Sequence, residues 1–362
     1  MLDPRPPQDV SQAAIDLLAS AELFDLHLDT MIPHRLVGYD LNRRHAKPAF
    51  GGRFFGHLDF PRAIENGLTA GMWSITTNPL RTEASRWRVL LDNLERLQDQ
   101  VEASEGRVHI AVDAAGFDEA REAGAIACLP AIQGGNSLAA APDGCASIPD
   151  DLVTRVTLVH LTNSLYGATS SPLALWRSNA GLTARGKALV EDMNRHRIFV
   201  DLAHINERGF WDAVEVHDKS MPLVATHTGV DGVRPHWRNL DDAQCKAIAE
   251  TGGTIGIIFQ DAFLRRKGGP KDGRMVVEHM AHVIDIVGED FVSVGSDYDG
   301  AIIPPDGLRA SPCYPRLVQW MLDEGWSEQR VLKILGGNAL RCLRSMRPRG
   351  WKQTGSETLK AP

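Results

Sequence analysis

The sequence predicts a single (β/α)8 TIM barrel, because eight short apolar runs alternate with helical segments over 362 residues and meet at Gly-rich corners. Strand–helix alternation is typical of a parallel sheet, and eight strands close such a sheet into a barrel. A doubly wound open sheet is the alternative. The GxGxxG turn that usually accompanies that fold is absent from the sequence.

The predicted strands are short and apolar, and they cover residues 23–28, 68–76, 126–132, 156–161, 198–202, 223–226, 254–258 and 291–295. Helical periodicity marks the intervening segments 84–101, 183–195, 207–216, 241–250 and 275–287. Thr183 and Asp241 stand at the start of two of these segments, where they would cap a helix. A ninth apolar run, 108–112, fits this scheme only as an extra strand before the third barrel strand.

We expect one barrel domain at residues 23–345. An N-terminal arm with a first helix (1–22) precedes it, and a polar tail (346–362) follows it. The long segment 31–67 between the first two strands is either a lid or specificity loop or a solvated loop.

Composition excludes several classes of partner. With Lys+Arg 39 against Asp+Glu 46, the net charge is −7, which argues against nucleic acid. No apolar run is long enough for a membrane helix, and the start lacks the layout of a signal peptide. The five cysteines form no CxxC pair, so we expect free thiols and a cytoplasmic protein. The oligomeric state stays open, with a homodimer as one option.

Histidines and aspartates gather at the ends of the predicted strands. His27 and Asp29 end the first strand two residues apart, so in an extended chain they point the same way. His160, His204, His227 and Asp297 follow four other strands. Since strand ends meet at one rim of a barrel and buried charge is costly, this pattern predicts a divalent metal site.

Nine motifs in chain order carry a more specific signal: 25–29 (DLHLD), 132–137 (IQGGNS), 157–160 (TLVH), 181–183 (GLT), 191–195 (EDMNR), 200–204 (VDLAH), 238–239 (RN), 251–253 (TGG) and 295–300 (GSDYDG). Together they resemble the membrane (renal) dipeptidase family of the amidohydrolase superfamily, from about residue 25 to 345.

The resemblance implies a metal-dependent hydrolase with two ions at the barrel mouth. His27 and Asp29 would hold one ion, and His204 and His227 would hold the other. His160 would contact the substrate carbonyl. Asp297 would pass protons between the attacking water and the leaving amine, and Arg238 would bind a substrate carboxylate.

Two positions depart from the family. The glutamate that bridges both metals in the family is Gln133 here, and a neutral amide cannot bridge as a carboxylate does. One or two ions per chain are therefore expected, unless Gln133 is a structural side chain beside the Gly134–Gly135 turn. Phe263 stands where the family often has a substrate-contacting tyrosine, which implies an altered substrate preference unless the loop is shifted. Zinc is the expected metal, and iron or manganese would also suit the ligands.

The expected activity is hydrolysis of a small amide with a free carboxylate, a dipeptide or an N-acyl amino acid. Two alternatives stay open. One is a one-metal amidohydrolase that acts on a non-peptide C–N bond, and the other is a catalytically silent barrel with a binding role.

Overall fold

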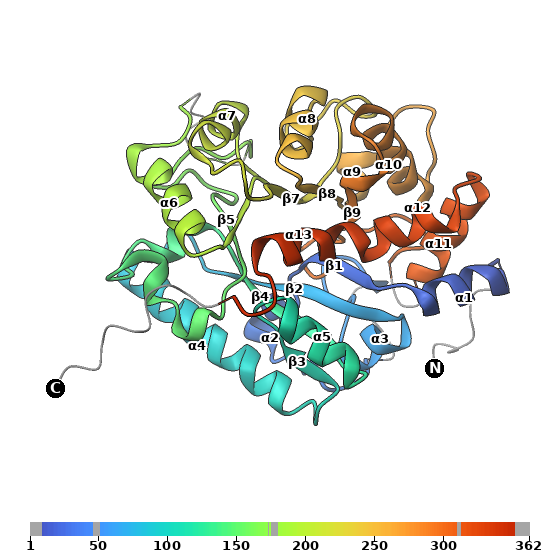
Figure 1. The fold of residues 1–362 in the computed structure, drawn as a ribbon, viewed down its shortest axis with the longest axis horizontal. Coiled ribbons are helices and arrows are strands. Elements are labelled where there is room, and N and C mark those ends of the chain that lie inside the picture. Colours follow the sequence, from blue (N-terminus) through green and yellow to red (C-terminus); the bar gives the residue numbers. More distant parts are fainter. Residues whose placement is uncertain (1–8, 46–50, 173, 175–179, 310–312, 352–362) are drawn as a thin grey trace.

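The computed structural model describes residues 9–45, 51–172, 174, 180–309 and 313–351 (Figure 1). The remaining parts of the predicted arm and tail, residues 1–8 and 352–362, lie outside the described residues. The described chain contains nine strands: β1 Leu23–Leu28, β2 Leu68–Thr76, β3 Val108–Ile110, β4 Ile126–Gln133, β5 Arg155–Thr157, β6 Phe199–Asp201, β7 Val224–Thr228, β8 Thr254–Ile257 and β9 Val292–Val294.

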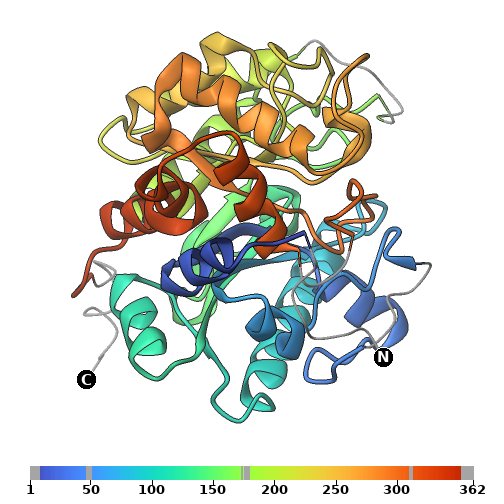
Figure 2. The same ribbon diagram turned by 90° about the vertical axis from the view of Figure 1, so that its right-hand side faces the viewer.

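Eight of these strands close into a parallel barrel. The ring runs β1–β2–β4–β5–β6–β7–β8–β9, and β9 pairs with β1 to complete it. This confirms the predicted TIM barrel and rules out the open sheet. In Figure 2 the helices α4 and α5, cyan to green, and the helices α8 and α10, yellow to orange, lie on opposite sides of the strands.

The ninth apolar run forms β3, outside the ring. It pairs with the first half of β4, from Ile126 to Cys128, while β5 pairs with the second half, from Ala131 to Gln133. The run is therefore the extra strand that precedes the third barrel strand.

Helices cover the outside of the barrel: α1 Gln12–Ser20, α2 Met31–Val37, α3 Phe60–Glu65, α4 Glu83–Glu102, α5 Ala114–Glu122, α6 Ala184–Arg195, α7 Glu207–Val216, α8 Asp242–Glu250, α9 Asp261–Leu264, α10 Arg274–Val287, α11 Tyr314–Asp323, α12 Glu328–Leu332 and α13 Asn338–Met346. The five predicted helices are α4, α6, α7, α8 and α10. Thr183 and Asp241 cap α6 and α8 as expected.

One predicted strand is shifted. The run 156–161 predicts a strand through Leu161, but β5 spans Arg155–Thr157 and ends there. The strand begins at Arg155, which is fully buried. Because arginine is charged, a search for apolar runs does not include this residue. His160 consequently lies in the loop three residues after the strand.

The described part of segment 31–67 is packed against the barrel. Oδ1 of Asp299, just after β9, accepts hydrogen bonds from the backbone N–H groups of Gly56 at 2.6 Å and His57 at 2.9 Å. Arg62 and Asp59 form a fully buried ion pair at 2.7 Å. These buried contacts argue against a solvated loop and leave a lid or specificity role open.

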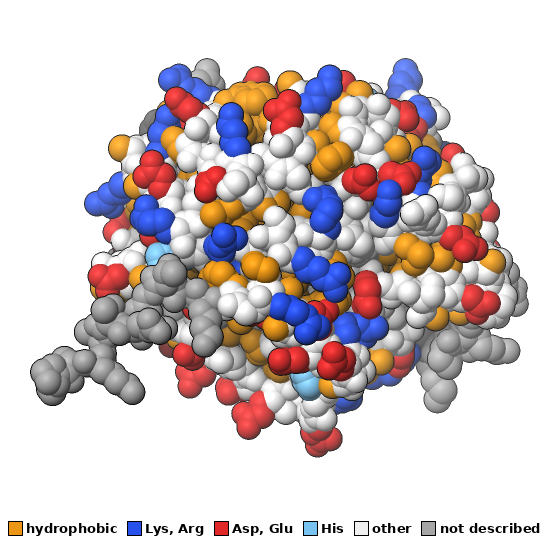
Figure 3. All heavy atoms as spheres, in the orientation of Figure 1, with side chains coloured by type: hydrophobic (Ala, Val, Ile, Leu, Met, Phe, Trp, Pro, Cys, Tyr) orange, Lys and Arg blue, Asp and Glu red, His pale blue; other side chains and the backbone are white. Residues whose placement is uncertain are grey.

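An apolar cluster inside the barrel is closed off by α13, whose Leu340, Leu343 and Met346 pack with strand residues such as Phe24 and Phe199. On the face shown in Figure 3, acidic and basic side chains of the described residues are interspersed. Among the described helices, none combines the length and apolar character needed to cross a bilayer.

Candidate metal centre

The strand ends bring three predicted site residues together, the ligands His27 and Asp29 and the proton carrier Asp297. His27 ends β1 fully buried, and its Nε2 atom lies 3.5 Å from Oδ2 of Asp29. The same atom lies 3.6 Å from Oδ1 of Asp297, which follows β9. The ligand atoms of these three buried side chains lie within 4.8 Å of one another. One histidine and two carboxylates in this arrangement suit a divalent cation.

A second pair of histidines adjoins this group. The Nε2 atoms of His204, after β6, and His227, in β7, lie 2.9 Å apart. The ring centroids of His27 and His227 are 3.8 Å apart, so all three histidines share one site. Gln133, at the end of β4, places its Nε2 atom 3.3 Å from His204 Nε2 and 3.4 Å from His227 Nε2. Gln133 thus lies among the predicted ligands, beside the His204–His227 pair.

The backbone at these positions is unusual. His204 has φ +66° and Asp297 has φ +61°, in the left-handed region that non-glycine residues rarely adopt. Gly134 has φ +99°, and a Cβ there would lie 2.8 Å from Oδ1 of Asn136. Strained backbone concentrated at one rim is typical of a functional site.

The buried carboxylate of Asp201 supports the cluster from the end of β6. Its Oδ1 accepts backbone N–H groups from Ala203 at 3.1 Å and Thr226 at 3.0 Å. Its Oδ2 accepts the hydroxyl groups of Thr157 at 2.6 Å and Thr226 at 2.8 Å, and Nη1 of Arg155 at 3.3 Å. A carboxylate oxygen of Asp201 and one ring nitrogen each of His27 and His227 also lie within 4.8 Å of one another. Both oxygens of Asp201, however, already accept the hydrogen bonds just described. We therefore assign it a supporting role.

Arg155 is the residue that the sequence analysis missed. Its guanidinium is fully buried beneath the cluster, and Nη2 lies 3.0 Å from Nδ1 of His27. Arg155 and Thr157 are two residues apart on one strand, so their side chains point the same way, and Thr157 pairs with Asp201 of the next strand. This spacing is the feature of the sequence that could have indicated Arg155.

Burial shifts the ionisation of the site. It lowers the pKa of His27, His204 and His227 well below the usual histidine value, which keeps their rings neutral, as metal ligation requires. It raises the pKa of Asp29 to about 7 and that of Asp297 well above its usual range. A nearby cation would favour the ionised form of both carboxyl groups.

Several buried polar atoms of the cluster lack a hydrogen-bond partner within the described parts of the chain: His27 Nε2, Asp29 Oδ1, Gln133 Oε1 and His204 Nδ1. Unsatisfied buried polar atoms are costly unless a ligand or ion completes them. The donor set therefore fits a divalent metal.

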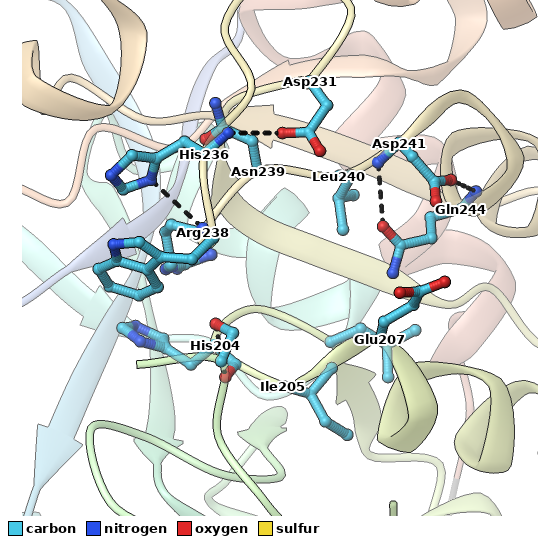
Figure 4. Close-up of a pocket in the computed structure, with 13 residues that line it drawn as sticks. His204, Ile205, Glu207, Asp231, His236, Arg238, Asn239, Leu240, Asp241 and Gln244 are labelled. Atoms are coloured by element: carbon cyan, nitrogen blue, oxygen red, sulfur yellow. Dashed lines mark hydrogen bonds between the residues drawn. The ribbon is translucent and has the colours of Figure 1, made fainter. Parts of the chain in front are cut away.

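Arg238 lies beside the cluster and lines a cavity of about 180 Å³ (Figure 4). Its Nη2 donates to the carbonyl of His227 at 2.7 Å, while Nε, also buried, has no hydrogen-bond partner in the described structure. Burial lowers the pKa of Arg238 to about 10, so it remains a cation at neutral pH. The cavity is lined by Ser170, Leu202, His204, Ile205, Glu207, Asp231, His236, Trp237, Arg238, Asn239, Leu240, Asp241 and Gln244.

The two remaining candidates lie at the edge of the site. The half-buried His160 packs edge-on to His204, with ring centroids 4.6 Å apart. Burial lowers the pKa of the His160 ring to about 4. Phe263, in α9, does not line the cavity, but its ring lies 4.7 Å from that of His236 and 5.5 Å from that of Trp237, both of which do. Phe263 therefore packs against two residues of the cavity wall.

Comparisons with known proteins agree with this geometry. The family described as Membrane dipeptidase (Peptidase family M19) matches residues 11–352. The chain is 29% identical over 311 residues to dipeptidase tcpJ of Claviceps purpurea, covering 83% of this chain and 72% of the relative. It is similar to the crystal structure of dipeptidase AC, a metallopeptidase of family M19, with 28% identity, a TM-score of 0.78 and coverage of 91% and 99%. It is also similar to a metallopeptidase from Rhodobacter sphaeroides bound to a phosphinate mimic of the dipeptide L-Ala-D-Ala, with 27% identity, a TM-score of 0.77 and coverage of 90% and 99%.

Proposed function

We propose that this chain, which belongs to the membrane dipeptidase family (peptidase family M19), hydrolyses a small amide with a free carboxylate, most simply a dipeptide or an N-acyl amino acid. The observation that carries the proposal is the buried group of His27, Asp29 and Asp297 beside the His204–His227 pair. Neutral imidazoles and carboxylates with unsatisfied atoms, gathered at a barrel mouth, are suited to metal-assisted hydrolysis.

His27 and Asp29 would hold one ion, and His204 and His227 would hold a second. Gln133, the last residue of β4, lies beside this second pair. A divalent metal supplies a water molecule of lowered pKa and polarises the scissile carbonyl. We propose zinc, since His and Asp side chains are among its usual ligands.

Asp297 would move the proton. Its carboxyl faces the cluster, and burial raises its pKa well above the usual range in the metal-free protein, which favours uptake of a proton. His160 packs against His204, and from there its ring would contact the substrate carbonyl.

Arg238 would bind the substrate carboxylate. Its Nη2 donates to the carbonyl of His227, its buried Nε has no hydrogen-bond partner among the described residues, and the residue lines the adjoining cavity. A guanidinium suits this role because its fork of N–H donors matches a carboxylate. The dipeptide mimic bound to the Rhodobacter sphaeroides relative supports a dipeptide-sized substrate.

A second candidate function rests on Gln133. A neutral amide beside His204 and His227 removes one negative charge that would hold two dications together, which favours a one-metal enzyme acting on a non-peptide C–N bond. Elemental analysis of the purified protein separates the possibilities. About two ions per chain supports the two-metal hydrolase, about one supports the variant, and none supports a binding protein.

The activity is tested on protein loaded with zinc, using dipeptides, N-acyl amino acids and the same compounds with an amidated carboxyl end. We expect hydrolysis of the free acids, loss of activity on the amides, and loss of discrimination between the two in Arg238→Met. Equal rates on acids and amides with wild-type protein would contradict the role of Arg238. No hydrolysis by metal-loaded protein would contradict the proposed activity.

We also propose a cytoplasmic location. The support is that Cys128, Cys145, Cys245, Cys313 and Cys342 are all free thiols and all buried. Thiol titration of the denatured chain without reductant should find five, and a lower count would contradict a reducing compartment.

A further inference from the structure

We propose that Arg155 is a positioning residue that holds His27 with its ring proton on Nε2, so that this chain restrains its own His27 from ligating a metal. The proposal rests on the proposed metal centre for its consequence, but the position of the proton can be measured in metal-free protein.

The contacts around Nδ1 of His27 carry the argument. The nearest is Nη2 of Arg155 at 3.0 Å, and a guanidinium can only donate hydrogen bonds. The hydroxyl of Ser74 lies 3.3 Å away, and its oxygen already accepts from the same Nη2 of Arg155. The Ser74 hydroxyl keeps a hydrogen that it can donate to Nδ1, and the hydroxyl oxygen of Thr226 lies farther away, at 3.5 Å. Because the donor-only Nη2 of Arg155 is the nearest partner, Nδ1 must offer its lone pair, and the single proton of the neutral ring stands on Nε2.

Nε2 is the atom that faces the candidate ligands. It lies 3.5 Å from Asp29 and 3.6 Å from Asp297, and ligation through it requires a lone pair there. The proton would have to move to Nδ1, where it would meet the N–H of Arg155. A metal-ligating histidine usually donates its other N–H to a carboxylate, carbonyl or water. Arg155 supplies the opposite kind of partner.

The guanidinium is not free to turn away. Nη1 donates to Thr157 at 2.6 Å, to the carbonyl of Ile132 at 3.2 Å and to Asp201 at 3.3 Å. Arg155 and Asp201 are both fully buried. The ion pair and these hydrogen bonds fix Nη2 beneath His27, and the positive charge opposes a dication above the ring as well.

The test measures which ring nitrogen of His27 carries the proton, by long-range 1H–15N NMR of metal-free protein labelled in histidine. The His27 signals are assigned by their loss in His27→Gln. We expect Nε2–H in the wild type and in Arg155→Lys, which keeps a donor-only cation, and movement of the proton to Nδ1 in Arg155→Met. A wild-type His27 that carries its proton on Nδ1 would overturn the proposal.

Metal affinity gives the second readout. Titration with zinc, followed through the His27 signals, should show about tenfold tighter binding at His27 in Arg155→Met than in the wild type, because supporting partners of a ligand typically change affinity by about 10- to 100-fold. Arg62→Met removes another fully buried arginine paired with an aspartate, and should change neither readout. Unchanged affinity in Arg155→Met with a moved proton would overturn the link to the metal, and no zinc binding by any variant would instead contradict the proposed metal centre.

Discussion

His27 and His227 stack at the centre of the barrel with ring centroids 3.8 Å apart, yet their Nδ1 atoms face opposite kinds of partner. Nδ1 of His227 lies 2.9 Å from the hydroxyl of Thr226, whose hydrogen goes to Asp201, so the threonine oxygen accepts N–H from His227. Nδ1 of His27 lies 3.0 Å from the donor-only Arg155. His227 therefore presents a lone pair at Nε2, and His27 presents an N–H.

This difference shows that ligand residues alone do not define a metal site. Both histidines come from strand ends, both are fully buried and both are neutral. The partner of Nδ1, Arg155 for His27 and Thr226 for His227, decides whether Nε2 carries a proton or a lone pair. Asp201 forms hydrogen bonds with both of these partners.

The largest expected effect comes from Asp297, the carboxylate that faces His27. Asp297→Asn removes the proposed proton carrier and should lower kcat by about 100- to 10,000-fold. Zinc binding at His204 and His227 should persist. Steady-state kinetics of the zinc-loaded variant test this, with Asp118→Asn, a surface carboxylate paired with Arg344, as the control. A loss of less than tenfold would remove Asp297 from the mechanism.

Asp29 should give the next largest effect, as a pH dependence of stability in metal-free protein. Its pKa is about 7 in the folded state and about 3.9 in an unfolded chain, so between these values the folded protein binds more protons. The wild type therefore loses stability as pH rises from about 4 to 7, because it must bury a charged carboxylate. Asp29→Asn has no carboxyl group to ionise and does not lose this stability. From about pH 4 to pH 7, the free energy of unfolding of the variant relative to that of the wild type should therefore rise by on the order of 2–4 kcal/mol. Urea unfolding at several pH values measures the difference, and a constant difference would contradict it.

Thr226→Val tests the difference between His27 and His227, because Thr226 is the partner of Nδ1 of His227. The change is nearly isosteric and removes the oxygen that orients His227, so zinc affinity should fall by about 10- to 100-fold. Thr254→Val is the matched control, since Thr254 is a buried threonine that bonds Ser293 in the neighbouring strand. Isothermal titration with zinc checks this. Equal losses in the two variants would mean that the effect is structural.

Gln133→Glu should have the smallest effect. It changes the metal site formed by His204 and His227. It places a carboxylate beside His204 and His227 with almost no change in volume. We expect the second ion to bind several-fold more tightly and hydrolysis of simple dipeptides to increase. Gln133→Met, which removes the amide oxygen, should do the reverse. Unchanged metal stoichiometry and affinity in the glutamate variant would assign Gln133 a structural role beside the Gly134 turn.

Much of the fold could be predicted because apolar runs and caps are local signals. The eight strand runs, the extra strand at Val108 and the caps Thr183 and Asp241 are all found. The prediction does not include α2, α3, α5, α9, α11, α12 and α13. The segment 31–67 that contains α2 and α3 is held in place by the distant Asp299, which no local pattern indicates.

The site could be predicted in part for a related reason. His27, Asp29, His204, His227 and Asp297 converge because each follows a strand of the same barrel. The spacing of Arg155 and Thr157 indicates that both side chains face the same way, but the effect of Arg155 on His27 could not be predicted, because it depends on a contact across 128 positions in the chain. The contact of Phe263 with substrate stays a prediction, and its packing against His236 and Trp237 depends on how α9 is placed, which no local pattern indicates.

The most direct test of the metal centre is an anomalous diffraction map from crystals soaked in zinc. We predict a peak at the barrel mouth about 2.0–2.1 Å from Nε2 of His227, with His204 as a second ligand. A second peak at His27 and Asp29 should be weaker in the wild type and stronger in Arg155→Met. A fully soaked crystal with no peak at this cluster would contradict the account.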